Sequence, residues 1–305
     1  MKIFLTGATG LIGGTIAAKL IGAGHTVRGL VRDAERGKLL AAKGIEPVVG
    51  TLDHLDTLAA EARTADATFN TANADNPFAA DALVNALKGS GKTLIHTSGS
   101  TIVGDHSAGE YPSAVYHEDL RRPQPLPEKA SRIATDALVA ASATEGVRSM
   151  VLCPTLVYGT GLGVRTVGPQ VMNFIKLAQE RGQPCHIGAG KNVWSHVHVE
   201  DCAEAYLLAF EKAQAGAYYF LAGGEATWLE MAQAIGRLLG LGEKTGTISN
   251  VEAVRRWGAP FAHAMGGNSR LSSAKAKAEL GWSPSRKSIL HDIEFGSFKQ
   301  ALAAG

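Results

Sequence analysis

The chain has 305 residues, of which 45% are apolar and 19% charged, so it can enclose a full hydrophobic core and is not a disordered protein. Its formal net charge of +2 and its lack of a basic block give no basis for a nucleic-acid partner. No apolar run approaches the roughly 18 residues that span a bilayer, so we expect no membrane partner. The 3 widely spaced cysteines exclude a disulfide framework and favour a reducing, cytoplasmic location.

The amino end predicts a strand that turns through glycines into a helix. An apolar strand at residues 2–5 precedes the turn 6–13 (TGATGLIG), and an amphipathic stretch follows it. Because the interrupting glycines break the apolar run, we expect this fold element rather than a signal peptide. Such a turn presents unpaired backbone N–H groups to a phosphate at the helix N-terminus. We predict a dinucleotide site containing Thr6, Gly7, Thr9, Gly10, Leu11, Ile12 and Gly13.

Strands and helices alternate along the rest of the chain. We predict strands at 27–31, 45–49, 67–71, 93–97, 149–152 and 218–221, and helices at 34–43, 55–63, 77–88, 129–144, 170–181, 201–215, 227–239 and 270–280. Repeated βα units predict an α/β Rossmann fold, a doubly wound parallel sheet with helices on both faces. The segment 99–127, rich in Gly, Pro, Asp and Ser, is expected to be a long functional loop.

The alternation weakens after Gly159, which predicts a second region. We expect the dinucleotide-binding domain at residues 1–160, completed by about 193–222, and a small carboxyl-terminal α/β cap region at 161–192 and 223–305. Four aromatic residues near the cap favour a hydrophobic or aromatic ligand: Trp194, Trp228, Trp257 and Phe261. We expect a monomer or a homodimer.

Ligands of a parallel α/β sheet bind at the carboxyl ends of its strands. After the glycine turn, the predicted strand ends supply further candidate cofactor residues, which are Arg32, Asp53, Thr71, Ala72, Asn73, Pro154, Leu156 and Val157. The end of the fifth strand supplies two candidate catalytic residues, Ser98 and Ser100.

Six motifs in order resemble the extended and atypical short-chain dehydrogenase/reductase superfamily, in particular its NAD-dependent epimerase/dehydratase group. They are TGATGLIG at 6–13, GTLD at 50–53, TSGS at 97–100, PTLVYG at 154–159, HVHVED at 196–201 and LGWSP at 280–284. The resemblance implies that the glycine turn binds a pyrophosphate, that Asp53 contacts the adenine, and that residues 154–157 meet the nicotinamide. It places Ser98 or Ser100 near the substrate-polarising serine, and Gly99 in that serine's own register. We slightly favour Ser98.

The end of the second strand bears on the choice of cofactor. A ribose 2′-OH is held by a carboxylate there, whereas a 2′-phosphate requires a guanidinium. Arg32 therefore favours NADP, and Asp33 keeps NAD as the alternative unless its side chain caps the next helix.

The sequence departs from the family at the catalytic tyrosine. None of the 6 tyrosines is followed by a lysine four residues later. By alignment, Glu128 takes the tyrosine position and Arg132 the lysine position, where Arg132 is expected to hold the ribose. Glu128 is a poor acid because Arg132, one turn away, would lower its pKa. Among the loop tyrosines, Tyr116 is the main candidate proton donor, with Tyr111 beside it.

We expect no metal site. His196 and His198 share one face of an extended segment near Asp201, but no third ligand stands at a standard spacing. The favoured function is transfer of a hydride between NADP and a small, hydrophobic carbonyl or alcohol substrate. Two alternatives stay open: a sugar-nucleotide epimerase or dehydratase, and a non-catalytic NADP-binding sensor protein.

Overall fold

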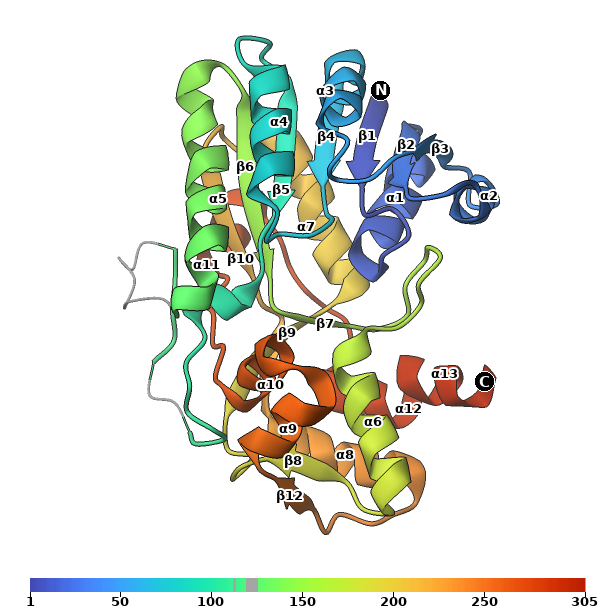
Figure 1. The fold of residues 1–305 in the computed structure, drawn as a ribbon, viewed down its shortest axis with the longest axis vertical. Helices are drawn as coiled ribbons and strands as arrows, with labels where there is room; N and C mark the ends of the chain where they lie inside the picture. The colour runs from blue at the N-terminus through green and yellow to red at the C-terminus, as the bar shows by residue number, and fades with distance from the viewer. Residues whose placement is uncertain (112–113, 119–125, 305) are drawn as a thin grey trace.

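A computed structural model describes residues 1–111, 114–118 and 126–304. Its main feature is a seven-stranded sheet, in which all neighbouring strands are parallel, in the order β10-β6-β5-β4-β1-β2-β3 (Figure 1). The strands are β1 Lys2–Thr6, β2 Thr26–Val31, β3 Glu46–Val49, β4 Ala67–Asn70, β5 Thr93–Thr97, β6 Arg148–Pro154 and β10 Ala217–Leu221. The predicted Rossmann fold is confirmed.

Helices pack on both faces of this sheet, and each face encloses its own core. The first core includes Ile3, Ile16 and Tyr206, which join the sheet to α1 (Leu11–Gly22) and α7 (Val199–Lys212). The second includes Phe4, Leu83 and Val139, which join the opposite face to α4 (Pro77–Leu87) and α5 (Ala130–Ala141). Alternating strand residues therefore serve opposite cores. The flanking helices are α1 Leu11–Gly22, α2 Ala34–Ala41, α3 Leu55–Thr64, α4 Pro77–Leu87, α5 Ala130–Ala141, α7 Val199–Lys212 and α11 Ala274–Leu280.

The remaining elements form a smaller region below the carboxyl ends of the strands (Figure 1). Its sheets are β11-β9-β7 and β12-β8, with strands β7 Leu156–Tyr158, β8 Cys185–Ile187, β9 Val193–His198, β11 Gly224–Thr227 and β12 Gly246–Ile248. Its helices are α6 Pro169–Arg181, α8 Trp228–Leu239, α9 Asn250–Trp257, α10 Ala259–Gly266, α12 Ile289–Phe295 and α13 Ser297–Ala304. The ring centroids of Phe174 and Trp228 lie 4.3 Å apart in the core of this region.

Several predicted boundaries differ from the structure because tertiary pairing overrides local pattern. The predicted helix at 270–280 begins only at Ala274, since Ser269 and Leu271 form bridges to Trp194 and Tyr116. Within the segment 193–222, α7 and β10 pack with the central sheet, and β9 pairs with β7 and β11 while its Val197 lies in the core that α7 shares.

The short elements β7, β11, β12, α9, α10, α12 and α13 were not predicted. The expected loop at 99–127 contains a 3-10 turn, η1 Ser100–Val103, and lies partly outside the described residues. No described helix has both the length and the apolar character needed to cross a membrane.

Candidate active site

The glycine turn between β1 and α1 is as tight as the sequence predicts. Gly7 has φ +77°, and a Cβ there would lie 2.8 Å from the main chain of Thr71. A Cβ at Gly13 would lie 2.4 Å from the carbonyl oxygen of Gly7. Gly10 caps α1 without a side chain, so the helix N-terminus stays open. The glycines thus let the turn pack tightly against Thr71, and the uncapped N-terminus of α1 fits the diphosphate of a dinucleotide, which needs close backbone approach.

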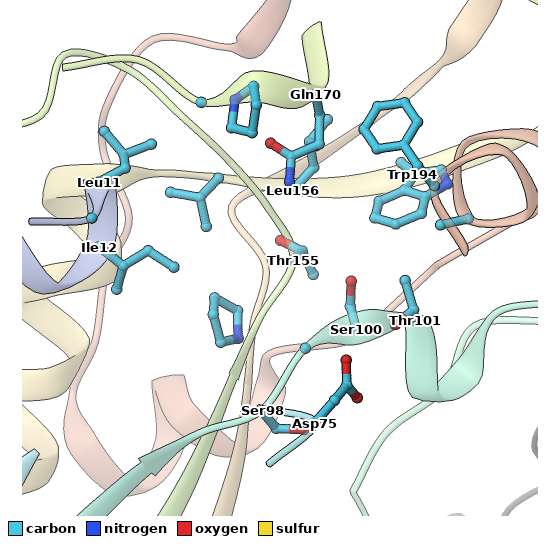
Figure 2. A pocket seen from close by; sticks show the side chains of 18 of the residues that line it. Leu11, Ile12, Asp75, Ser98, Ser100, Thr101, Thr155, Leu156, Gln170 and Trp194 are labelled. Atoms are coloured by element: carbon cyan, nitrogen blue, oxygen red, sulfur yellow. The ribbon is translucent and has the colours of Figure 1, made fainter. Parts of the chain in front are cut away.

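A cavity of about 690 Å³ runs from this turn to the cap region (Figure 2). Strand ends and the first turn of α1 form one side, and Trp194, Phe261 and Met265 form part of the other. The structure brings many predicted residues to its lining: Gly10, Leu11, Ile12, Gly13, Thr71, Ser98, Ser100, Arg132, Pro154, Leu156 and Val157.

A second cavity, of about 540 Å³, holds most of the other predicted cofactor residues. Gly7, Thr9, Arg32, Asp53, Ala72 and Asn73 line it. Arg36, which is not among the predicted residues, lines it too. The predicted helix at 34–43 could have indicated Arg36, because the first turn of that helix places residue 36 near the end of β2.

Asp33, the residue that kept NAD as an alternative, uses its carboxylate to cap a helix. Its carboxylate accepts a 2.8 Å hydrogen bond from the Arg36 amide as the N-cap of α2, and it also pairs with the Arg36 guanidinium. The hydrogen bond from the Arg36 backbone lowers the pKa of Asp33, so the carboxylate stays ionised. Asp33 is not among the residues lining the cavity, whereas Arg32 and Arg36 are.

Thr6 supports the turn from beneath. It is fully buried, and its Oγ1 donates a 2.6 Å hydrogen bond to Asn70 Oδ1. The Asn70 amide in turn donates to His96 Nδ1 at 3.0 Å. Burial, with a contribution from Arg132, lowers the pKa of His96 to about 4. A neutral imidazole therefore accepts this hydrogen bond, and Thr6 holds the turn rather than facing either cavity.

The two candidate serines differ in their hydrogen bonding. Ser98 Oγ donates a 2.6 Å hydrogen bond to Asp136 Oδ2, which also accepts one from Tyr218 at 2.9 Å. Figure 2 shows the Ser100 side chain pointing into the cavity from η1. Both serines line the cavity, but the Ser98 hydroxyl is hydrogen-bonded to a buried carboxylate, so Ser100 is the better candidate for the substrate oxygen than the predicted Ser98.

Arg132 binds two neighbouring residues of the cavity lining beside Ser100. Its Nε and Nη2 bind both carboxylate oxygens of Asp75, at 2.9 and 2.5 Å, and its Nη1 donates to Thr101 Oγ1 at 2.8 Å. A guanidinium with three such donors is rigidly placed. The adjacent Lys129 lines the same cavity, so two cations face this wall.

Two candidates for the missing acid lie away from the cavity. Tyr116 does not line it; its main chain pairs with Arg270 and Ser272, and its ring packs against a separate small core. Glu128 is exposed and lies 3.1 Å from His106 Nε2. The pKa of Glu128 is lowered, as expected, but by a backbone hydrogen bond and then by His106, not by Arg132. We therefore remove Tyr116 from the candidate catalytic set, which leaves Ser100 and Ser98.

The histidines of the HVHVED segment have structural roles. His198 Nδ1 accepts the Glu200 amide and caps α7. Asp201 accepts the backbone amides of Ser285 and Arg286. His196 is buried with its ring against Tyr158, and burial lowers its pKa to about 4.

The Rossmann sheet, the glycine turn and the cavity at its carboxyl edge define a protein of the dinucleotide-binding α/β class. The chain belongs to the NAD dependent epimerase/dehydratase family, whose model matches residues 3–221. This places it in the short-chain dehydrogenase/reductase superfamily, as the resemblance implies.

Individual relatives agree with this assignment. An oxidase from Acremonium sp is 30% identical in sequence to this protein, and the matched region covers 100% of this chain and 99% of the oxidase. The 4-hydroxy-2-methyl-3-oxo-4-farnesyl-3,4-dihydroquinoline-1-oxide ketoreductase of Stigmatella aurantiaca is 26% identical, covering 73% and 69%. The structure of dTDP-glucose 4,6-dehydratase from Bacillus anthracis in complex with NAD has a TM-score of 0.79, at 17% identity over 99% and 97% of the chains, and shows the same fold. Family and reductase relatives together support an oxidoreductase.

Proposed function

We propose that this protein is an NADP(H)-dependent reductase or dehydrogenase acting on a small, hydrophobic carbonyl/alcohol pair. The observation that carries the proposal is one cavity lined by the glycine turn, by residues 154–157 and by the Ser100 side chain. This arrangement provides a dinucleotide cradle and a hydroxyl donor in one space. When bound, the nicotinamide cofactor supplies or accepts the hydride.

Ser100 is the residue we assign to the substrate oxygen. Its hydroxyl donates a hydrogen bond to that oxygen and stabilises the negative charge that develops on it during reduction. Lys129, which lines the same wall, adds positive charge near that oxygen, whereas the charge of Arg132 is paired with the Asp75 carboxylate. The proton that completes the alcohol comes from water. Arg132 holds the Ser100 segment in place through Thr101 and Gly99, and it is the group we assign to the cofactor ribose.

The preference for NADP rests on two arginines at the second cavity. Arg32 and Arg36 line the space at the end of β2, where the 2′-substituent of the adenosine ribose binds in this fold. Two guanidiniums suit a 2′-phosphate. Asp33, the carboxylate that would favour a 2′-OH, instead caps α2.

The substrate class follows from the lining opposite Ser100. Trp194, Phe261, Met265 and Leu156 present apolar surface to the cavity. A relative named as a ketoreductase of a farnesyl-bearing quinoline is consistent with a lipophilic substrate. Sugar-nucleotide epimerisation is disfavoured because Glu128, at the tyrosine position, lies outside the cavity lining.

A combined binding and turnover assay tests the proposal. NADPH and NADH are titrated by calorimetry, and NADPH oxidation is then followed with aldehydes, ketones and enones of increasing hydrophobicity. We expect NADPH to bind more tightly and at least one lipophilic ketone to be reduced. Tight NADPH binding without turnover of any carbonyl would favour the sensor protein instead. No heat with either nucleotide would overturn the assignment.

A further inference from the structure

Three side chains from three separate segments meet beside the large cavity. His106 lies on the loop after η1, Glu128 on the turn η2 (Pro127–Lys129), and His263 on α10. One ligand atom from each lies within 4.8 Å of the other two. The rings of His106 and His263 have centroids 5.0 Å apart, and His106 Nε2 is 3.1 Å from Glu128 Oε1. The cluster is open to solvent, because His106 and Glu128 are exposed and His263 is half-buried.

We propose that His106, Glu128 and His263 bind a divalent metal ion of the zinc type. Two imidazole nitrogens and one carboxylate oxygen form a donor set that Zn²⁺ takes in sites with an open fourth position. With metal–ligand distances of about 2.0–2.1 Å, tetrahedral donors lie about 3.4 Å apart. The His106–Glu128 pair is already closer than that, at 3.1 Å, and the His263 ligand atom lies within 4.8 Å of both partners, so a small movement of its side chain would complete the set.

The backbone on either side of the cluster is held in place by a second set of polar contacts. The carboxylate of Asp105, next to His106, accepts hydrogen bonds from the backbone N–H of Asn268 at 2.9 Å and from Asn268 Nδ2 at 3.0 Å. Asn268 follows α10, which carries His263. A Cβ at Gly267 would lie 2.2 Å from the Asp105 carbonyl oxygen, so the two segments pack without room for a side chain. Two ligand-bearing segments are thus fixed to each other before any ion binds.

An ion here would tie the cap region to the wall of the cavity. The small space beside the cluster is lined by Thr101, Lys129, Trp194, Pro260 and Ala264, all of which also line the large cavity. A bound ion would therefore join α10 to η2 and to the loop after η1 across one edge of the cavity. Glu128, which stands at the family's tyrosine position, has a role as a ligand in this proposal. None of the three residues lines the large cavity, so the proposed metal site does not rest on the proposed reductase function.

Calorimetry with ZnCl₂ on the tag-free, chelator-treated full chain tests the site. We expect one ion per chain, and a loss of affinity of at least about tenfold in both His263→Ala and Glu128→Gln, since even second-shell changes cost that much. His291→Ala is the matched control, because His291 is an exposed helical histidine stacked on Phe295 and remote from the cluster. The three cysteines are buried and do not compete for the ion.

Cobalt substitution provides a second measurement. We expect Co²⁺ to give the visible absorption of a four-coordinate site in the wild type and in His291→Ala, and not in His263→Ala. Circular dichroism establishes that each variant is folded, and NADPH titration of the same samples separates this site from the cofactor site. Absence of stoichiometric binding, or its retention in the Glu128→Gln/His263→Ala double variant, would show that the cluster is only a surface ion pair.

Discussion

The guanidinium of Arg132 lies in the space that a side chain at Gly99 would need. A Cβ at Gly99 would be 2.7 Å from Arg132 Nη1, which also approaches the Gly99 carbonyl oxygen at 3.4 Å. Two departures from the family pattern therefore lie in contact: the larger cation in the lysine position occupies the space next to the glycine in the register of the serine. Ser100, one residue later, presents a hydroxyl to the cavity.

This relationship predicts coupling between the two positions. Gly99→Ala alone should reduce the free energy of unfolding by about 1–3 kcal/mol, because the added methyl group overpacks against Arg132. Arg132→Lys removes the guanidinium and relieves that contact. We therefore expect the double variant to be more stable than the sum of the single effects by about 1 kcal/mol or more, measured by urea unfolding. Strictly additive effects would contradict the coupling.

The two serines should separate activity from stability. Ser100→Ala is expected to lower kcat/KM for the best carbonyl substrate by about a hundredfold with little change in Tm, since it removes a donor to the developing oxyanion. Ser98→Ala should instead lower the free energy of unfolding by about 1–3 kcal/mol, because the buried Asp136 carboxylate loses one of its hydrogen-bond donors. Steady-state kinetics and thermal unfolding of both variants provide the measurements. Full activity in Ser100→Ala would show that another group polarises the substrate.

Cofactor preference should depend on the arginines at the second cavity. Arg32→Ala and Arg36→Ala are each expected to raise the Kd for NADPH about tenfold while leaving the Kd for NADH nearly unchanged, because each removes a charge-assisted hydrogen bond to the 2′-phosphate. Arg28→Ala is a suitable control, since Arg28 is paired with Glu61 at 2.7 Å. Equal losses for NADPH and NADH would count against recognition of the 2′-phosphate.

Acid stability should depend on His196. Its pKa is lowered to about 4 in the fold by burial, so an unfolded chain binds the extra proton more readily. The stabilising contribution is complete above the unfolded pKa of about 6.5 and is lost as the pH falls toward 4. At pH 5 the loss from this one residue is about 2 kcal/mol.

His196→Phe retains a ring against Tyr158 but removes the titrating group. We expect the difference in unfolding free energy between pH 7 and pH 5 to be smaller in this variant by about that amount. His291→Phe, at an exposed position, is the control. An unchanged pH dependence in His196→Phe would mean that other groups account for the acid sensitivity.

The sequence alone determined the elements that depend on local pattern. The apolar run before TGATGLIG and the alternation of strands and helices led to the Rossmann fold. The same pattern named many of the residues that line the two cavities. Hydrophobic periodicity and backbone conformation act over a few residues, so they can be recognised without knowledge of the fold. The helix cap at Asp33 was also accessible in this way.

Only the tertiary structure decided which side chains face the cavity. Ser98 and Ser100 are indistinguishable by pattern, and the contact between Ser98 and Asp136 depends on how α5 packs beside β5. Tyr116 was plausible by its place in the loop but pairs with the segment before α11. The meeting of His106, Glu128 and His263 likewise requires the cap to fold back on the cavity wall. Contacts between residues far apart in the chain arise from packing, and no local spacing encodes them.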